Sequence, residues 1–504
     1  MFFKLKSAAT IGLDCVPVDV EIDINKGQTN FSIVGLPDTS IQEAKSRIYS
    51  ALKNSGFSYP FNFRILINLA PADLQKQGPA YDLPMAVGII YLSNNLEIKL
   101  GDALLVGELA LSGELRHTDG ILPLALYARK TGLKRIFLPE QDAAEASLVD
   151  GLEIYPIKNL KQLINHLTNI ELIEQYQRPE SWNDFETPEY NLDMSLVKGQ
   201  EFVKRALEIA ASGAHNILMT GPPGSGKTLL ARTLPSILPR LTIDESLEIT
   251  KIYSVTGLIK NGFIKTRPFR CPHHTASGVS LVGGGRYPRP GEISLAHRGV
   301  LFLDEFPEFP RSVLENLRQP LEDGTITVSR VQGSCSFPAQ FILVASQNPC
   351  PCGFSTDPDK ACVCTPSQII RYQKKVSGPL LDRIDLHVEV PRINFEKLSS
   401  DEIGELSSLV RQRVETARQI QNIRFKNLPI HTNAEMGNAE IKKFCQINPE
   451  STELLRTAVE QMHLSARSYN RILKLGRTIA DLDQNENIQP QHIAESLQFR
   501  AKSE

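Results

Sequence analysis

The sequence has almost no net charge and no long apolar run. Its formal net charge is −2, so nucleic-acid binding, if present, must come from local basic patches and not from the chain as a whole. No stretch of about 18 apolar residues occurs, so we expect no membrane-spanning helix and no membrane partner. Near the start, Asp14 follows Lys4 and Lys6 before an apolar signal core can form, which favours a cytoplasmic protein.

Cysteine is also scarce. Eight cysteines among 504 residues exclude the disulfide framework of a small secreted protein. Four of them are scattered and show no pairing signal, and the other four lie close together near residue 357. An apolar content of 41% and a charged content of 22% are ordinary for globular proteins, and the length predicts several domains.

The residue patterns divide the chain into three domains and a linker. Residues 1–174 mix strands and helices, and alternating apolar residues over 16–24 predict a half-buried strand. The polar, proline-containing stretch 175–193 is typical of a linker. Residues 194–394 form the predicted nucleotide-binding core. Residues 395–504 show the apolar spacing of helices, which predicts an all-α lid.

A glycine-rich loop lies between a predicted buried strand, 215–220, and a helix that opens near 229. The loop fits G-x-x-x-x-G-K-[ST] with Gly221, Pro222, Pro223, Gly224, Ser225, Gly226, Lys227 and Thr228. In this motif backbone N–H groups turn inward around phosphates at a helix N-terminus. Lys227 would reach the β- and γ-phosphates, and the Thr228 hydroxyl would ligate Mg²⁺. The loop therefore predicts a site for ATP and Mg²⁺.

Two more apolar strands end in polar side chains that suit the same site. Residues 299–303 lead to Asp304, placed to hold Mg²⁺, and Glu305, placed to polarise the attacking water. The strand before Asn348 delivers an amide that can hydrogen-bond the γ-phosphate or the water. Taken alone, each of these two strand ends could equally be a polar residue that closes a strand and has no catalytic role. Together with the glycine-rich loop, the two strand ends predict ATP hydrolysis.

These motifs resemble those of AAA+ ATPases. The segment 197–200 resembles the one that precedes the first helix of these ATPases. Further segments resemble the magnesium-chelatase-like branch, the YifB/ComM family: 267–275, 283–286, 288–297 and 377–385. The resemblance covers nearly the whole chain. The resemblance implies an α/β fold, an AAA+ P-loop NTPase core followed by a C-terminal helical lid.

The same resemblance assigns two arginines. Arg383 corresponds to the arginine finger, which reaches the γ-phosphate bound by a neighbouring subunit and so implies a ring, a homo-hexamer. A structural ion pair of Arg383 with Asp382 or Asp385 is the alternative. Arg467 corresponds to the second sensor of this branch.

Residues 1–174 resemble the Lon protease catalytic domain, an α+β domain of the ribosomal S5 domain 2-like fold. Ala80 falls where the protease has its nucleophilic serine, and Pro123 falls where it has its catalytic lysine. Because alanine offers no nucleophile and proline no base, we expect no protease activity. A scaffold, an oligomerisation platform or a DNA-binding face is the expected role.

Basic and aromatic residues interleave between 260 and 298, which suits phosphates and stacked bases. Arg286 and Arg289 in this insert are candidate DNA contacts. Arg330 is another, in the alternating segment 325–333, where relatives place a pore-facing hairpin. A solvated face or pairing at subunit interfaces is the alternative for each.

The clustered cysteines Cys350, Cys352, Cys362 and Cys364 form C-x-C-x₉-C-x-C. Four thiolates suit a tetrahedral Zn²⁺ and leave no open coordination position, so such a site would be structural. The C-x-C spacing is tighter than the usual C-x₂₋₄-C of zinc sites. Free cytosolic thiols or a redox-sensitive pair are the alternatives.

The resemblance implies an ATP-dependent motor that remodels single-stranded or branched DNA, a branch-migration helicase in recombination or natural transformation. Two other classes stay open, a metal-chelatase-type motor subunit and an ATP-switched assembly module that acts on a protein partner. The Lon-like domain argues against the dedicated chelatase motor, and stimulation of ATPase activity by DNA would separate the DNA motor from the switch.

Overall fold

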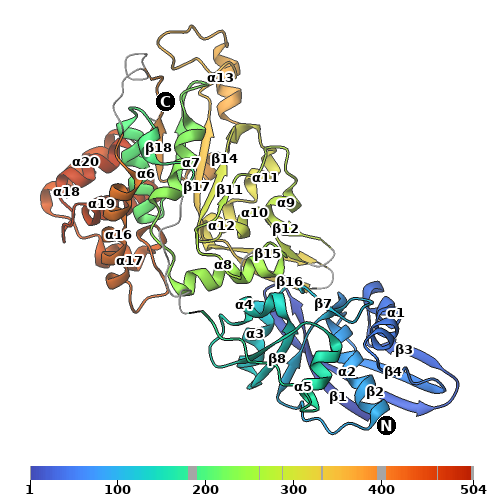
Figure 1. Cartoon of the computed structure of the whole chain (residues 1–504). Coiled ribbons are helices and arrows are strands. Elements are labelled where there is room, and N and C mark those ends of the chain that lie inside the picture. Colours follow the sequence, from blue (N-terminus) through green and yellow to red (C-terminus); the bar gives the residue numbers. More distant parts are fainter. Residues whose placement is uncertain are drawn as a thin grey trace. The chain divides into compact units, whose positions relative to one another are not determined.

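The computed structural model describes residues 2–179, 190–259, 262–285, 288–330, 333–393, 404–462 and 464–500 (Figure 1). Its contacts divide the chain into two compact units. The first contains Met1–Asp184, Ile243–Ile264 and Tyr287–Arg289, and the second contains Phe185–Thr242, Lys265–Arg286 and Pro290–Glu504. Residues 180–189 of the predicted linker lie outside the described residues.

The first unit is built on a seven-stranded mixed sheet. Its order is β3 (Asn30–Val34), β4 (Phe63–Ala70), β2 (Asp14–Lys26), β1 (Phe2–Ile11), β5 (Ala103–Leu105), β8 (Arg135–Pro139) and β9 (Glu153–Ile157). The strand predicted over 16–24 lies in β2, where Val18, Val20 and Ile22 are buried and the residues between them are more exposed. A two-stranded ladder pairs β6 (Glu108–Leu109) with β7 (Leu115–Arg116).

Helices complete the first unit as an α+β fold. They are α1 (Thr39–Asn54), α2 (Asp82–Asn94), α3 (Ile121–Lys130), α4 (Ala143–Ala146), α5 (Leu160–Leu167) and α8 (Ile243–Val255). Residues 82–90 of α2 are all buried, as expected of a helix that is apolar on every side.

Helix α8 belongs to the first unit although its sequence lies between the phosphate loop and Asp304. The Ser254 hydroxyl, near its C-terminus, donates a hydrogen bond to Glu145 Oε1 at 2.5 Å. The same carboxylate oxygen accepts from the backbone N–H of Leu122 at 2.7 Å. Leu247 packs against an apolar cluster that Ala80 also contacts. Ala80, the residue for which the resemblance predicted a lost nucleophile, therefore packs in the same apolar cluster as α8.

The second unit contains a five-stranded, all-parallel sheet that carries the nucleotide motifs. Its order is β11 (Phe269–Arg270), β14 (Val300–Leu303), β17 (Ile342–Gln347), β10 (Ile217–Thr220) and β18 (Leu386–Glu389). All residues of β14 are buried, as near-continuous apolar strands of parallel sheets are. The carboxyl ends of the strands meet at one edge, where ligands bind in open α/β sheets. This is the α/β architecture predicted for the core.

Among the described residues of the second unit, eight helices accompany this sheet before the C-terminal part. They are α6 (Glu201–Gly213), α7 (Lys227–Ile237), α9 (Gly278–Val282), α10 (Glu292–Leu295), α11 (Arg311–Glu315), α12 (Arg318–Asp323), α13 (Pro366–Gln373) and α14 (Gly378–Leu381). Short ladders pair β12 (Gly283–Gly284) with β13 (Arg289–Pro290) and β15 (Thr325–Arg330) with β16 (Gly333–Pro338). The β15–β16 pair is antiparallel, so the hairpin predicted over 325–333 is present.

The C-terminal part of the second unit is helical, as predicted (Figure 1). It consists of α16 (Ser407–Arg424), α17 (Asn438–Phe444), α18 (Pro449–Gln461), α19 (Ala466–Leu482) and α20 (Pro490–Gln498). The apolar positions Ile472, Leu475 and Ile479 all lie on the buried side of α19. Among the described residues, no helix is both long and apolar enough to cross a membrane.

Candidate active site

The glycine-rich loop connects β10 to the N-terminus of α7, as its sequence predicts. Gly224 and Gly226 have φ of +78° and +90°, the left-handed region that favours glycine. A Cβ on Gly221 would lie 2.2 Å from the Val390 carbonyl oxygen, so only glycine lets the loop approach the chain that leaves β18. The loop thus turns closely in front of the first N–H groups of α7, an arrangement that binds phosphate.

Lys227 is buried beneath this loop. Its Nζ donates to the carbonyl oxygens of Gly221 at 2.7 Å and Pro222 at 2.9 Å, and to Asn348 Oδ1 at 3.3 Å. Burial lowers the pKa of the amine, and the negative charge of Asp304 opposes that effect. Phosphate oxygens are stronger acceptors than these neutral carbonyls, so a triphosphate satisfies the ammonium better than the protein does alone.

Asp304 follows β14 and lies beside Thr228. The Thr228 hydroxyl donates to Asp304 Oδ2 at 2.9 Å, and the Glu305 N–H donates to Asp304 Oδ1 at 3.0 Å. Adjacent ligands of an octahedral Mg²⁺ with bonds of about 2.1 Å are about 3.0 Å apart, so the two oxygens fit neighbouring positions around one ion. The Ser346 hydroxyl also donates to Asp304 Oδ1. Sequence reasoning did not find Ser346, whose only signal is a hydroxyl within a buried strand.

Glu305 is exposed and has an unusual backbone. Its φ is +53°, which is uncommon for a residue with a side chain and is often found at functional sites. Its Oε2 lies 3.3 Å from Nδ1 of His274. His274 lies in the insert between 260 and 298, where basic and aromatic residues interleave, and its contact with Glu305 was not foreseen because the two are 31 positions apart in sequence.

Arg383 lies at the opposite end of β10 from the phosphate loop. Its carbonyl oxygen accepts a hydrogen bond at 3.1 Å from the side chain of Asn216, the residue before β10. The four residues of β10 span about 13 Å, beyond the reach of one arginine side chain. The Arg383 guanidinium pairs with Glu322, and not with Asp382 or Asp385 among the described ion pairs.

Arg467 also stands near Glu322. Its Nη2 lies 3.7 Å from Glu322 Oε1, and both side chains are largely exposed. The structure therefore groups Arg467 with Arg383 beside Glu322. The neighbouring lid arginines are engaged elsewhere, Arg471 with Asp385 at 3.4 Å and Arg477 with Asp481 at 3.0 Å.

The candidate DNA contacts are only partly described. Arg289 is exposed in β13. Arg286 lies outside the described residues, and so does the side chain of Arg330, whose backbone belongs to β15. Other basic residues of the insert bond to protein groups: Arg270 pairs with Glu292 at 2.6 Å, and Arg267 donates to backbone carbonyls.

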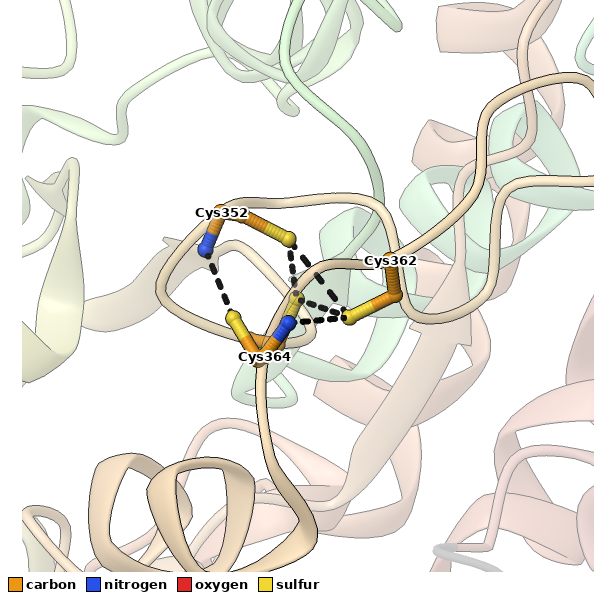
Figure 2. A group of neighbouring side chains, drawn as sticks. Cys352, Cys362 and Cys364 are labelled. Atoms are coloured by element: carbon orange, nitrogen blue, oxygen red, sulfur yellow. Dashed lines mark hydrogen bonds between the residues drawn. The ribbon is translucent and has the colours of Figure 1, made fainter.

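The four clustered cysteines come together in the loop that follows β17. Figure 2 shows three of them, Cys352, Cys362 and Cys364, with their side chains turned toward one another. Their sulfur atoms all lie within 4.8 Å of one another, and all four are free thiols in the structure. Such a group can hold a metal ion.

Three family models match the chain. "Magnesium chelatase, subunit ChlI" matches residues 193–398, "Subunit ChlI of Mg-chelatase" matches 20–142, and "Magnesium chelatase, subunit ChlI C-terminal" matches 404–500. The matched segments include the phosphate loop, Asp304, Asn348 and Arg383.

Curated relatives are similar over almost the full length. Competence protein ComM of Haemophilus influenzae is 43% identical over 503 residues, 98% of this chain and 96% of the relative. Protein YifB of Escherichia coli is 42% identical with the same coverage of both chains. The magnesium-chelatase 67 kDa subunit of Heliobacterium mobile is 26% identical over 39% of this chain and 31% of that subunit. The chain therefore belongs to the YifB/ComM family of magnesium-chelatase-like AAA+ ATPases.

Proposed function

We propose that this ATPase is a ring-forming motor that remodels DNA, a branch-migration helicase that acts on single-stranded or branched DNA in recombination or natural transformation. Membership of the AAA+ ATPase family implies ATP and Mg²⁺ as cofactors. The name of one relative, competence protein, directs the proposal to natural transformation.

In this proposal each residue of the site has one task. Lys227 and the N–H groups of the loop bind the β- and γ-phosphates, and Thr228 and Asp304 hold Mg²⁺, with Ser346 fixing the carboxylate. Glu305 orients the attacking water, and Asn348, held by Lys227, contacts the γ-phosphate or that water. Mg²⁺ held by Thr228 and Asp304 would neutralise charge that develops on the phosphate oxygens.

The observation that carries the ring is the position of Arg383. Because its backbone is bonded to Asn216 at the amino end of β10, its guanidinium cannot serve the phosphate loop of its own subunit. We assign it to the ATP of a neighbouring subunit, where a positive charge offsets the charge of the transition state. Arg467 lies beside the same Glu322 and would face the same neighbour. A closed ring of six subunits meets this requirement at every site.

The DNA would contact the hairpin β15–β16 and the basic insert. Arg330 in β15 and Arg289 with Arg286 in the insert are the proposed phosphate contacts. Mg²⁺ alone takes part in the chemistry, and a zinc ion at the four cysteines would be structural because four thiolates leave no open position. The cytoplasm, which supplies ATP and keeps thiols reduced, is the proposed compartment.

ATPase and strand-exchange assays on defined DNA test this function. We expect four-way or forked DNA to raise ATP turnover severalfold, and branch migration of a labelled junction to require hydrolysable ATP. Arg289→Ala and Arg330→Ala should each weaken DNA binding and reduce its salt slope by about 1. Arg456→Ala is the matched control, since Arg456 is an exposed lid arginine paired with Glu453, and it should bind DNA as the wild type does.

One result would contradict the proposal. If neither forked nor four-way DNA binds or raises turnover while the protein hydrolyses ATP, the motor does not act on DNA. The protein would then be an ATP-switched assembly module on a protein partner, and nucleotide-dependent capture of that partner would be the next measurement.

A further inference from the structure

The loop after β17 holds four cysteine sulfurs at the spacing of a metal site. Cys350 Sγ lies 3.4 Å from Cys352 Sγ and 3.7 Å from Cys362 Sγ. The sulfur atoms of Cys352 and Cys362 are 3.5 Å apart. A zinc–sulfur bond of about 2.3 Å gives a tetrahedron with edges of about 3.8 Å. The separations thus match a tetrahedral set of thiolates, and they are far longer than a disulfide bond of about 2.05 Å.

Backbone N–H groups point at these sulfurs. The N–H of Cys352 donates to Cys364 Sγ at 3.4 Å, and the N–H of Cys364 donates to Cys362 Sγ at 3.4 Å (Figure 2). Such bonds stabilise the negative charge of a thiolate and orient it toward a metal. The hydrogen bond from Cys352 to Cys364 therefore joins the two C-x-C segments to each other.

The residues between the two C-x-C segments make a closed turn. Asp357 Oδ1 accepts from the N–H groups of Asp359 at 2.9 Å and Lys360 at 3.2 Å. The Asp357 carboxylate also pairs with Arg392 at 2.8 Å, just beyond β18. The loop is thus attached to the sheet from both sides, which limits how far the sulfurs can separate.

The cysteine loop also touches the phosphate loop. Gly353, directly after Cys352, has φ of +87°, and a Cβ built on it would lie 2.6 Å from Cδ of Pro223. At the other end of the same segment, Cys350 follows Asn348 by two residues, and Asn348 Oδ1 lies 3.3 Å from Lys227 Nζ. A movement of the cysteine loop is therefore transmitted to both the Pro223 turn and the Asn348 amide.

We propose that Cys350, Cys352, Cys362 and Cys364 bind one Zn²⁺ ion that holds Asn348 and the phosphate loop in place, so that ATP turnover depends on this metal. Zinc suits four sulfur ligands in a tetrahedron and undergoes no redox change. The ion orders a catalytic loop and takes no part in the reaction. This inference rests on the ATPase activity of the family and is independent of DNA as the proposed substrate.

Metal analysis of the intact chain, purified without chelators, tests the site. We expect about one zinc per chain. Cys352→Ser and Cys364→Ser should retain less than about half of the zinc and should turn over ATP at least about tenfold more slowly. Cys271→Ser, which changes an exposed cysteine outside the cluster, is the matched control and should keep its zinc. Removing zinc from the wild type with a zinc-selective chelator in excess Mg²⁺ should lower turnover, and added Zn²⁺ should restore it.

A second variant separates metal binding from its effect on the ATP site. Gly353→Ala keeps all four thiols but places a methyl group against Pro223. We expect it to retain about one zinc per chain and to show a KM for ATP raised severalfold or a lowered kcat. Wild-type kinetics in a zinc-loaded Gly353→Ala protein would overturn the coupling between the two loops.

Three other outcomes would overturn the metal assignment itself. They are a metal-free protein with four reactive thiols and full ATP turnover, a cluster found as disulfides by intact mass, and a site that carries iron with visible absorption. A zinc-loaded protein that does not hydrolyse ATP would still contain the proposed metal site. It would contradict the ATPase activity and, with it, the proposed dependence of ATP turnover on zinc.

Discussion

The hydroxyl of Thr228 donates a hydrogen bond to Asp304 Oδ2 at 2.9 Å, across 76 positions of sequence. The contact joins the first turn of α7 to the end of β14, and so brings together two oxygens that fit neighbouring ligand positions of one Mg²⁺. The Ser346 hydroxyl donates to the other oxygen of the same carboxylate. Asp304 is thus held by hydroxyls from two neighbouring elements, α7 and β17.

Asp304→Asn tests this arrangement. Because the amide removes the charge that would hold Mg²⁺, we expect kcat to fall by about 10²-fold or more and the Mg²⁺ concentration for half-maximal turnover to rise. A Mg²⁺ titration of ATP turnover measures both quantities. Asp244→Asn is the control, because Asp244 is an exposed carboxylate on α8 far from β14 in sequence, and it should behave as the wild type. An unchanged Mg²⁺ dependence in Asp304→Asn would place the metal elsewhere.

Glu305→Gln separates ATP binding from hydrolysis. The amide keeps the shape of the side chain but cannot polarise water, so we expect the Kd for ATP to change little and turnover to fall by about 10²–10⁴-fold. Equilibrium binding of a fluorescent ATP analogue and single-turnover kinetics provide the two readouts. Glu308→Gln removes an exposed carboxylate that pairs with Lys375 at 3.0 Å, and it should hydrolyse ATP normally. Normal turnover in Glu305→Gln would disprove its role.

Arg383→Ala subunits mixed into wild-type protein test whether the arginine acts on a neighbour. If it does, each variant subunit disables an ATP site that is otherwise wild type, and activity falls faster than the wild-type fraction once subunits exchange. Steady-state ATPase rates across a series of mixing ratios give the curve. Mixtures with Arg456→Ala should show no such excess loss, since that arginine pairs with Glu453 on the lid surface. A strictly proportional loss for Arg383→Ala would rule out action between subunits.

Glu145 predicts a pH dependence in the first unit. Burial raises the pKa of its carboxyl to about 7, from an ordinary 4.5, against the opposing hydrogen bond from Ser254. The folded unit therefore holds this proton more tightly than the unfolded chain does. The stabilising contribution is complete below pH 4.5 and is lost as pH rises through 7, and it amounts to at most about 3 kcal/mol.

Glu145→Gln should remove that dependence. Hydrogen–deuterium exchange of peptides from α3 and α8, corrected for intrinsic exchange rates, measures local stability between pH 5 and 8. In the wild type we expect protection to fall over this range, and in Glu145→Gln we expect a flatter profile. Glu140→Gln is the matched control, because Glu140 is exposed and pairs with Lys158 at 3.3 Å. Equal profiles for wild type and Glu145→Gln would show that this carboxyl does not titrate there.

Sequence patterns sufficed wherever structure and chemistry are local. The phosphate loop was predictable because its glycines, Lys227 and Thr228 are consecutive and lie between an apolar strand and a helix. Asp304, Glu305 and Asn348 were predictable because parallel strands deliver their last residues to one edge of a sheet. Resemblance, and not a pattern of residues, singled out Arg383 and Arg467.

Contacts between distant segments were beyond sequence reasoning. Ser346 is one serine in an apolar strand, and only the register of β17 against its neighbours brings it to Asp304. His274 belongs to the basic insert in sequence, and only the fold brings its Nδ1 to 3.3 Å from Glu305 Oε2. Glu322 carries no motif, yet both Arg383 and Arg467 lie against its carboxylate.

The sequence by itself determined the phosphate loop and the strand ends Asp304 and Asn348, because these features depend on residue types at short, regular spacings, and its resemblance to a family indicated an AAA+ ATPase. Only the tertiary structure decided that α8 joins the first unit through Ser254 and Glu145, and that Gly353 of the cysteine loop lies against Pro223. The physical reason is that packing and hydrogen bonding depend on distance in space. The spacing of residues along the chain does not show which distant segments come into contact.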